Sequence, residues 1–287
     1  MQNPFSNTAF DMTALTASIN LLPNNYGKIE SMNLFPGKAV RFRHIAVEEK
    51  NGILNLLPTQ HPGAPGTVGK RDKRKVRTFS IPHIPHDDVV LPEEVQGIRA
   101  FGSETEVQAL ANVLTDHLQS MRNKHAITLE HLRMGALKGV ILDADGSTLV
   151  NLYDEFEIQP KEVSFALGTA TTDVKKKCLE VLRHIEDNLR GEYMTSVHTL
   201  VSPEFFDALT SHAKVKEAYE RWQDGLGLRA DMRSGFSFAG ITFEEYRGQA
   251  TDPDGNVRRF IAQDTAHCFP LGTSETFSTY FAPADFN

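Results

Sequence analysis

Ser237 is the residue whose setting comes nearest to a catalytic motif. It lies in the segment GFSFAG at 235–240. The nucleophile elbow of serine hydrolases needs the spacing G-x-S-x-G between a strand and a helix, because that sharp turn exposes the serine hydroxyl. Here Ala239 stands where the second glycine belongs, and no strand-then-helix pattern surrounds it. The sequence therefore gives little support to a serine nucleophile.

Two other groups of residues suggest metal binding and fail on spacing. His83 and His86 come without an HExxH motif or a paired cysteine. The segment DADGS at 143–147 resembles a calcium loop, but such a loop needs glycine at position 6 and glutamate at position 12. Counted from the first aspartate, Gly146 is at position 4 and Asp154 at position 12. We therefore expect a hairpin turn there. With no glycine-rich phosphate loop in the chain either, the sequence predicts no metal site and no cofactor.

The remaining candidate side chains fit a protein core. Cys178 and Cys268 form no CxxC pair and lie beside apolar residues, so we expect small buried thiols in a reducing compartment. His125 occupies an apolar position of a predicted helix and is expected to be a core histidine.

The strongest charge cluster is the segment KRDKRKVR at 70–77, which has six basic residues and one acidic residue. It has three interpretations: a solvated hairpin tip, a contact to nucleic-acid phosphates, or an ion-pair contact to an acidic neighbour. Only Phe79 is nearby to stack on a base, which weakens the nucleic-acid interpretation. The alternation through Val76 and Phe79 predicts that the charges sit on a β ribbon.

Composition indicates a folded protein with unequal charge along the chain. The 287 residues are 40% hydrophobic and 23% charged, with a net charge of -7. Residues 1–100 carry 12 basic and 9 acidic residues, a balance of +3, whereas residues 101–287 carry 18 and 28, a balance of -10. These parts could attract each other between copies of the protein, or they could equally be two unrelated surfaces. The chain has no apolar run long enough to cross a membrane and no secretory signal is expected.

The first third of the chain predicts an arm followed by a long hairpin. Residues 1–36 have scattered apolar residues and one helix-like stretch from Met12 to Leu22, stopped by Pro23. Residues 37–95 contain short apolar runs, the turn dipeptide Asn51-Gly52 and a Pro/Gly-rich stretch at 61–69. An isolated two-stranded ribbon is only marginally stable in water, so we expect this one to pack on another surface.

A long helix is predicted over 103–138. Ser103 and Glu106 have the spacing of a capping box, and Gly139 supplies a stop. The apolar residues follow steps of three and four and form one stripe: Val107, Leu110, Leu114, Leu118, Met121, Leu129, Leu132 and Ala136. Such a stripe suggests a spine lying along a sheet.

The rest of the chain mixes helices and strands. We expect a hairpin within 139–158 turning at Asp145-Gly146, a helix over 171–189, a buried strand at 198–203 and a helix over 203–222. The segments 241–248 and 257–264 bracket the turn DPDG and predict a second hairpin. These elements predict the α+β class rather than an alternating βαβ scaffold.

Four segments resemble the lambda-like phage major capsid protein E family. They are HPGAPGTVG at 61–69, KRKVRTFSIPHIPHDDVVLPEEVQGIRAFGSE at 73–104, ALKGVILDADGSTLVNLYDEF at 136–156 and CFPLGTSETFSTYFAPADF at 268–286. They occur in the family's order, and the similarity covers most of the chain. Glu157 stands where the resemblance leads us to expect glycine, a difference that bears on a local turn. The family is also expected to continue beyond APADF, whereas this chain ends at Asn287.

The resemblance implies the Hong Kong 97 capsid fold, an α+β fold with five parts. Residues 1–36 would be the N-terminal arm and 37–95 the extended β-hairpin loop. Residues 96–165 would hold the spine helix and the peripheral domain, completed by 268–287. Residues 166–267 would be the axial domain.

It also implies a function without catalysis: self-assembly into hexamers and pentamers of an icosahedral shell around double-stranded phage DNA. Scaffold, portal and decoration proteins are possible partners, and no sequence-specific DNA binding or membrane is expected. Assembly would occur in the bacterial cytoplasm, and the product would be the virion capsid. The predicted inter-subunit contacts are Leu56, Leu57, Arg71, Arg74, Lys75, Val76, Arg77, Phe79 and Ile81.

Three alternatives stay open at this stage. The first is a nanocompartment shell of the same fold that encloses protein cargo. The second is a monomeric hydrolase that uses Ser237 or a histidine pair. The third is a nucleic-acid-binding module that acts through residues 70–77.

Overall fold

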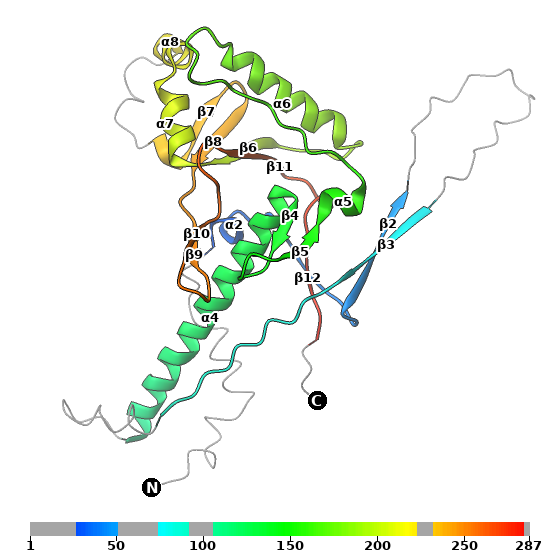
Figure 1. Ribbon diagram of the computed structural model, residues 1–287, viewed down its shortest axis with the longest axis vertical. Coiled ribbons are helices and arrows are strands. Elements are labelled where there is room, and N and C mark those ends of the chain that lie inside the picture. The colour runs from blue at the N-terminus through cyan, green and yellow to red at the C-terminus, as the bar shows by residue number, and fades with distance from the viewer. Residues whose placement is uncertain (1–26, 51–73, 92–105, 223–231, 284–287) are drawn as a thin grey trace, which may run out of the picture. The chain divides into compact units, whose positions relative to one another are not determined.

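The computed structural model describes residues 27–50, 74–91, 106–222 and 232–283 (Figure 1). The chain divides into two compact units. Unit 1 comprises Met1–Pro36 and His86–Phe277, and unit 2 comprises Gly37–Pro85 and Ser278–Asn287. The predicted stretch 12–22, the Asn51-Gly52 turn and the Ser103 cap lie outside the described residues.

Unit 1 is built around a four-stranded sheet. Its order is β11-β6-β8-β7, with β6 and β8 parallel and both outer pairs antiparallel. The strands are β6 (Ser196–Val201), β7 (Phe236–Phe238), β8 (Ile241–Glu245) and β11 (Ala266–Leu271). Parallel neighbours need a crossover. Between β6 and β8 the chain passes through α7 (Pro203–Ser211), α8 (Ala213–Trp222), the short 3-10 helix η5 (Met232–Ser234) and strand β7.

Strand β6 confirms the predicted buried strand, and both of its faces are covered. Val197 and Val201 point into one core, whereas Leu200 points into the other. Successive side chains of such a strand enter the two cores in turn, and His198 and Thr199 are buried there beside the apolar residues. The alternation of β6 therefore assigns the two cores to opposite faces of the sheet.

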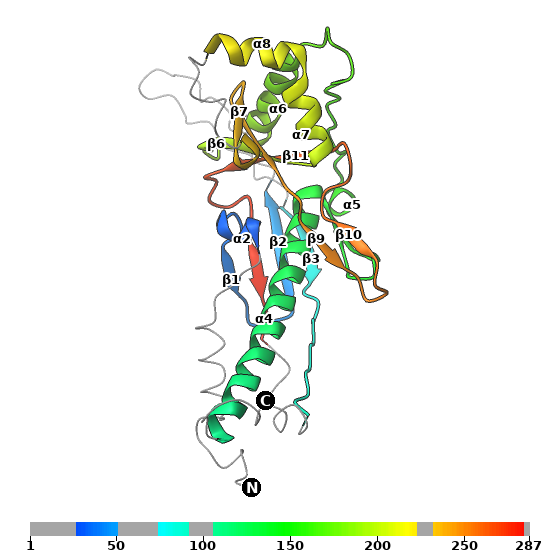
Figure 2. The ribbon, with the colours of Figure 1, turned by 90° about the vertical axis from the view of Figure 1, so that its left-hand side faces the viewer.

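The first core lies under three helices (Figure 2). Helix α6 (Val174–Asn188) confirms the predicted helix over 171–189 and is capped by the Asp173 carboxylate, which accepts from the Lys176 amide. Helix α7 begins at Ser202, whose hydroxyl accepts from the Phe205 amide. The predicted helix over 203–222 is interrupted at His212, whose ψ of 131° is extended.

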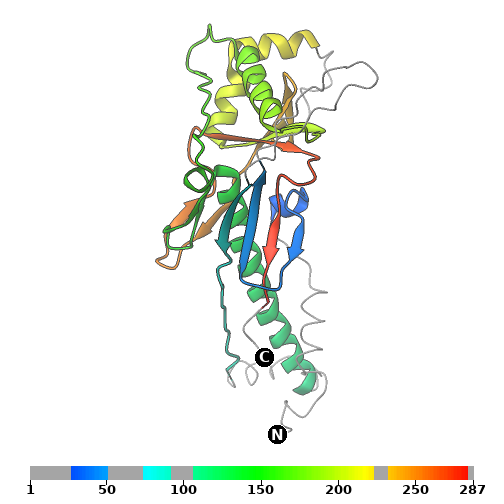
Figure 3. The ribbon, with the colours of Figure 1, turned by 90° about the vertical axis from the view of Figure 1, so that its right-hand side faces the viewer.

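The second core lies on the opposite face of the sheet, beside α2 (Lys28–Ser31) and α4 (Glu106–Lys138) (Figure 3). Its buried members are Ile29, Leu34, Phe35, Met134, Leu200, Phe260, Ile261 and Phe269. Residues 27–35, at the end of the predicted arm, thus form part of the core of unit 1. Helix α4 has 33 residues and is about 50 Å long, which confirms the long helix.

The buried face of α4 differs from the predicted apolar stripe. Met134 is fully buried, and Glu130 and Arg133 are buried beside it, whereas Leu129 and Leu132 are only half-buried. The prediction is wrong here because two buried charged residues lie on the inward face. His125 is also exposed rather than in a core, which corrects the second expectation for this helix.

Gly139 ends α4 with a φ of 83° and leads into the predicted hairpin of β4 (Val140–Leu142) and β5 (Thr148–Asn151). The expected second strand stops earlier than predicted, because α5 (Leu152–Phe156) follows directly. The Asn151 side chain accepts from the Tyr153 amide and so caps this short helix.

Glu157 follows α5 in the left-handed conformation, with φ 55° and ψ 40°. This agrees with the expectation of glycine at that turn, since glycine adopts this conformation without a Cβ penalty. We expect Glu157→Gly to raise the free energy of unfolding by about 0.5–1 kcal/mol, measured by chemical denaturation. Glu157→Ala is the matched control. It removes the rest of the glutamate side chain but keeps the Cβ atom, and with it the cost of the left-handed conformation. Equal stability of the two variants would contradict the backbone explanation.

The second predicted hairpin exists with different strands. β9 (Gln249–Thr251) and β10 (Val257–Arg259) flank the turn at 252–255. Residues 241–245 instead form β8 and pair with β6, which corrects the prediction that they belong to the hairpin. Ile241 and Phe243 are fully buried, and the sheet interior offers that burial where a two-stranded hairpin does not.

Unit 2 holds two strand pairs. β2 (His44–Lys50) and β3 (Arg74–Ser80) are antiparallel over seven residues each, which confirms a hairpin within 37–95. Residues 51–73 between them lie outside the described residues. β1 (Gly37–Ala39) pairs in parallel with β12 (Thr279–Phe281), so this unit joins an early segment of the chain to a late one.

Candidate assembly interface

Strand β3 holds most of the predicted contact residues. Those within the described residues are Arg74, Lys75, Val76, Arg77 and Phe79 in the strand, followed by Ile81. The Ile81 amide donates to the Arg43 carbonyl at 2.8 Å, which extends the pairing beyond the strand. Leu56, Leu57 and Arg71 lie outside the described residues.

The register of β3 places its apolar residues on different faces. Phe79 pairs with Ile45 and Arg77 pairs with Val47, and these four positions share one face. Val76 is on the other face and is 56% exposed. The alternation expected through Val76 and Phe79 is therefore wrong, because residues three apart in a strand point to opposite sides.

A partly buried ion-pair cluster joins α2 to the sheet. The Lys28 ammonium lies 2.6 Å from one Glu244 carboxylate oxygen, and His198 Nε2 lies 3.1 Å from the other. Burial lowers the pKa of His198, while the carboxylate of Glu244 opposes that shift. Within the part of the chain that the structure describes, His198 makes no hydrogen bond to a hydroxyl or thiol. The cluster holds elements together and offers no activated nucleophile.

Glu130 provides a second anchor for the same segment. One of its carboxylate oxygens accepts from the Ile29 amide at 2.9 Å and from the Tyr246 hydroxyl at 3.0 Å. Burial, followed by the negative charge of Glu130, raises the pKa of Tyr246 well above its usual range. Arg133, one turn further along α4, pairs with Glu30. Together these contacts attach residues 27–35 to α4 and to the segment after β8.

The residues considered for catalysis or metal binding are placed for structural roles. Ser237 Oγ lies 3.2 Å from Thr242 Oγ1 across the β7–β8 pair. Burial raises the pKa of Cys178 to about 12 and of Cys268 to about 11, so both thiols are protonated at neutral pH. Among the described residues, no group of three or more His, Cys, Asp or Glu side chains could hold a metal ion. None of the helices in those residues is both long and apolar enough to cross a membrane.

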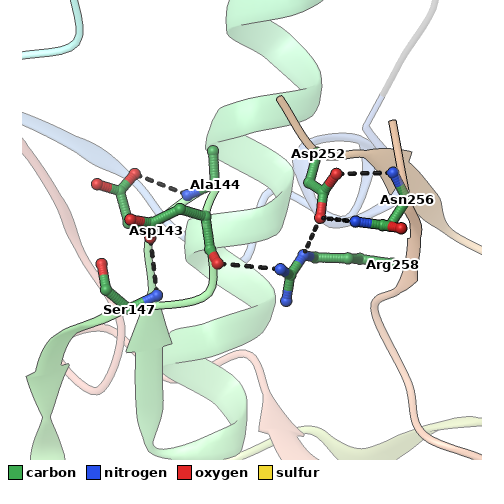
Figure 4. A network of polar contacts seen from close by, with 7 residues as sticks. Asp143, Ala144, Ser147, Asp252, Asn256 and Arg258 are labelled. Atoms are coloured by element: carbon green, nitrogen blue, oxygen red, sulfur yellow. Dashed lines mark hydrogen bonds and ion pairs between the residues drawn. The ribbon is translucent and has the colours of Figure 1, made fainter. Parts of the chain in front are cut away.

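The predicted hairpin turn at 143–147 is part of a polar network (Figure 4). The Gly146 amide donates to the Asp143 carbonyl, which confirms a tight turn. Arg258 Nη2 donates to the Asp145 carbonyl at 2.9 Å, and Arg258 Nε donates to the Asp252 carboxylate at 2.9 Å. The side chain of Asp252 is fully buried, and Asn256 donates to it twice. The Arg258 side chain therefore links the β9–β10 hairpin to the turn between β4 and β5 through hydrogen bonds to both.

Comparison with known proteins identifies the family. The model of the family "Phage major capsid protein E" matches residues 11–287. The chain belongs to the phage major capsid protein E family. The major capsid protein of Pseudomonas phage KPP10 is 33% identical over 293 residues, covering 96% of this chain and 83% of that protein. The major capsid protein of Salmonella phage Felix O1 is 28% identical, covering 91% and 78%.

A solved structure, the asymmetric unit of the bacteriophage PhiM1 mature capsid, aligns with 78% of this chain and 63% of that one. Its TM-score is 0.46 and its sequence identity is 13%.

Membership of the capsid protein E family assigns this chain the role of a major capsid protein. Its role is structural, it assembles from copies of itself, and its place is the virion capsid. The resemblance found in the sequence is thereby confirmed.

His267 makes the stability of this capsid protein depend on pH. Burial, and less strongly the charge of Lys138, lowers the pKa of His267 from 6.5 to about 4. The unfolded chain therefore takes up a proton below pH 6.5 that the folded chain does not accept until about pH 4, so stability falls across that range. We expect this loss to be about 2–3 kcal/mol, a value reduced for partial exposure.

The test compares the free energy of unfolding of wild type and His267→Gln at pH 7 and pH 4. The variant is expected to lose about 2–3 kcal/mol less than wild type between the two values. The same pH dependence in both proteins would contradict this assignment.

The sequence did not reveal the contacts that attach residues 27–35. In the sequence, nothing near Lys28 and Glu30 indicates that they form ion pairs. Ile29 is a single apolar residue and belongs to no helical or strand pattern. Their partners Glu244 and Arg133 lie more than a hundred residues away, so only the folded chain brings them together.

Proposed function

We propose that the chain builds the icosahedral head shell of a tailed double-stranded-DNA bacteriophage or prophage, with a Hong Kong 97-type fold. The family match over residues 11–287 carries this proposal. The mixed α+β content, the long helix α4 and the β2–β3 hairpin agree with it.

In this proposal the parts of the chain have separate roles. Residues 1–36 act as the arm, whose last part, 27–35, packs into the core of its own subunit, while 37–95 act as the extended loop and α4 as the spine. The peripheral domain comprises 96–165 with 268–287, and the axial domain comprises 166–267. Hexamers and pentamers form when the extended loop of one copy lies on the next subunit.

Charges and apolar residues of the extended loop would contribute differently. Arg71, Arg74 and Lys75 would pair with carboxylates of a neighbour at about 0–1 kcal/mol for each exposed pair, which favours register more than affinity. Arg77, also predicted for this contact, is 8% exposed and so has little side-chain surface to offer a neighbour. Leu56, Leu57, Val76, Phe79 and Ile81 would contribute more, at about 1.5–3 kcal/mol for each fully buried side chain. Because Val76 and Phe79 lie on opposite faces of β3, they would meet two different surfaces.

The partners follow from the same role. The shell would assemble in the bacterial cytoplasm, where scaffold, portal and decoration proteins could join it. It would enclose DNA without reading its sequence, and the net charge of -7 suits a container that does not hold its genome tightly.

Sedimentation velocity of the purified full chain tests the proposal. At high salt or with a crowding agent we expect particles of many copies, because a shell joins many weak contacts cooperatively. A stable 32 kDa monomer under all these conditions would contradict it.

A further inference from the structure

The loop 272–276 follows β11 and lies beside the residues that lead into β6. Leu271 is the last residue of β11, and its carbonyl accepts from the Thr195 amide at 2.8 Å and from the Thr195 hydroxyl at 3.1 Å. Gly272 then turns the chain with a φ of 78°. A Cβ atom at this position would lie 2.6 Å from the Thr195 side chain, so the close approach of the two segments requires glycine.

The same loop surrounds the carboxylate of Glu192. One oxygen of this carboxylate accepts from the amides of Ser274 and Glu275, both at 2.6 Å, and from the Ser274 hydroxyl at 3.1 Å. The other oxygen accepts from the Thr276 hydroxyl at 2.6 Å. The hydrogen bond from Thr276, followed by that from the Glu275 amide, lowers the pKa of Glu192. Successive amides that point at one oxygen are typical of a binding site for an anion.

The loop ends where the late part of the chain passes from unit 1 to unit 2. Phe277 is the last residue of unit 1, and its ring lies 5.2 Å from the ring of buried Phe35. Within unit 2, β1 and β12 pair in parallel (Figure 2). The Val40 amide extends this pairing by donating to the Phe281 carbonyl at 2.9 Å. The early and the late segment are therefore neighbours both before and after this crossing.

We propose that residues 274–276 form a binding site for a carboxylate, that Glu192 is its internal ligand, and that this contact is a latch on residues 277–281. While Glu192 is bound, Phe277 stays beside Phe35 and β12 keeps its pairing with β1. When the carboxylate leaves, the segment opens locally. The latch acts within one chain, so it does not depend on assembly.

The chemistry of the site favours a carboxylate over a phosphate. Among the hydrogen bonds that the described residues make to the Glu192 carboxylate, none comes from a cationic side chain. A phosphate carries more charge and is usually bound by arginine or lysine. A free carboxylate should not displace Glu192 from the wild-type site, because a ligand on the same chain acts at a high effective concentration.

Chemical rescue of Glu192→Ala tests the site in the unassembled full chain. Hydrogen exchange followed by NMR should be about tenfold faster at the amides of 274–281 and of Val40, and unchanged in β6 and β11. Sodium formate should restore slow exchange in this variant and have no effect on wild type, with sodium chloride at the same ionic strength as the reference. Unchanged exchange at Val40 would overturn the latch. Exchange that formate does not slow would overturn the carboxylate site.

Glu192→Gln tests the same site without leaving a cavity. Its neutral amide fills the space of the carboxylate, so exchange should be faster than in wild type, slower than in Glu192→Ala and insensitive to formate. A response to formate as large as that of Glu192→Ala would show that the anion binds elsewhere and would overturn the assignment.

Glu162→Ala is the matched control, because it removes an exposed glutamate from another loop of unit 1. Its exchange at Val40 should equal that of wild type. An equal increase in this control would overturn the latch, since the effect would then follow net charge. Faster exchange throughout β6 and β11 in Glu192→Ala would also overturn it, because Glu192 would then support the sheet and not the loop.

Discussion

A chain in which residues 51–73 are replaced by Asn-Gly should fold and yet form no particles. Lys50 and Arg74 are the last residues paired between β2 and β3, so a two-residue turn can join them and keep the hairpin register. The replacement removes Leu56, Leu57 and Arg71 from the proposed inter-subunit contact. Sedimentation velocity should show a monomer at concentrations where wild type assembles completely, with a melting temperature within a few degrees of wild type.

A second variant distinguishes the effect of the side chains in 51–73 from the effect of the length of that segment. It carries glycine and serine throughout 51–73 and keeps the original number of residues. If side chains of the loop make the contact, this variant also fails to assemble. Wild-type particles from the Asn-Gly variant would remove the role given to the extended loop. Particles from the Gly/Ser variant alone would show that only the length of the loop is needed.

Ile29→Ala should lower the free energy of unfolding by about 3 kcal/mol, within the usual 2–5 kcal/mol for this kind of core truncation. Ile29 is fully buried in the second core, and its amide donates to Glu130. The substitution removes apolar contacts and leaves a cavity, while the main-chain hydrogen bond remains. Urea denaturation followed by circular dichroism measures the change.

Ile158→Ala is the control for this substitution. Ile158 is 53% exposed, so the same truncation should cost no more than about 0.5 kcal/mol. If Ile29→Ala were equally mild, residues 27–35 would not belong to the core of unit 1, and the Glu130 and Glu244 anchors would lose their importance.

Local signals in the sequence predict the elements that depend on neighbouring residues. The helices α4 and α6 follow from their apolar spacing, and the turn at Asp145-Gly146 follows from the preference of glycine for positive φ. The strand β6 is predicted from the segment HTLV, and all four of these residues are buried.

Arrangements set by distant residues are not predictable in this way. Nothing local shows that residues 241–245 join the main sheet rather than the hairpin beside them, or that β1 pairs with β12. On α4 the inward face contains Glu130, whose burial is compensated by Ile29 and Tyr246. A hydropathy pattern assigns such a residue to the surface, since its partners are remote in sequence.

The candidate interface was predicted only in part. The basic stretch and its β-ribbon context follow from the sequence, and β3 confirms the ribbon from Arg74 to Ser80. The prediction that Val76 and Phe79 belong to one alternating face is wrong. Side chains alternate between the two faces of a strand, so residues three apart lie on opposite faces. The contacts of His86 and Asp88 with α4 are not predictable from the sequence, since their partners Lys124 and His117 lie 38 and 29 residues further along the chain.

Electron cryo-microscopy of particles formed by the full chain tests the central claim most directly. We predict closed icosahedral shells in which the β2–β3 hairpin of each subunit lies on an adjacent subunit. Particles that never close, or density in which the hairpin folds back onto its own subunit, would contradict the account.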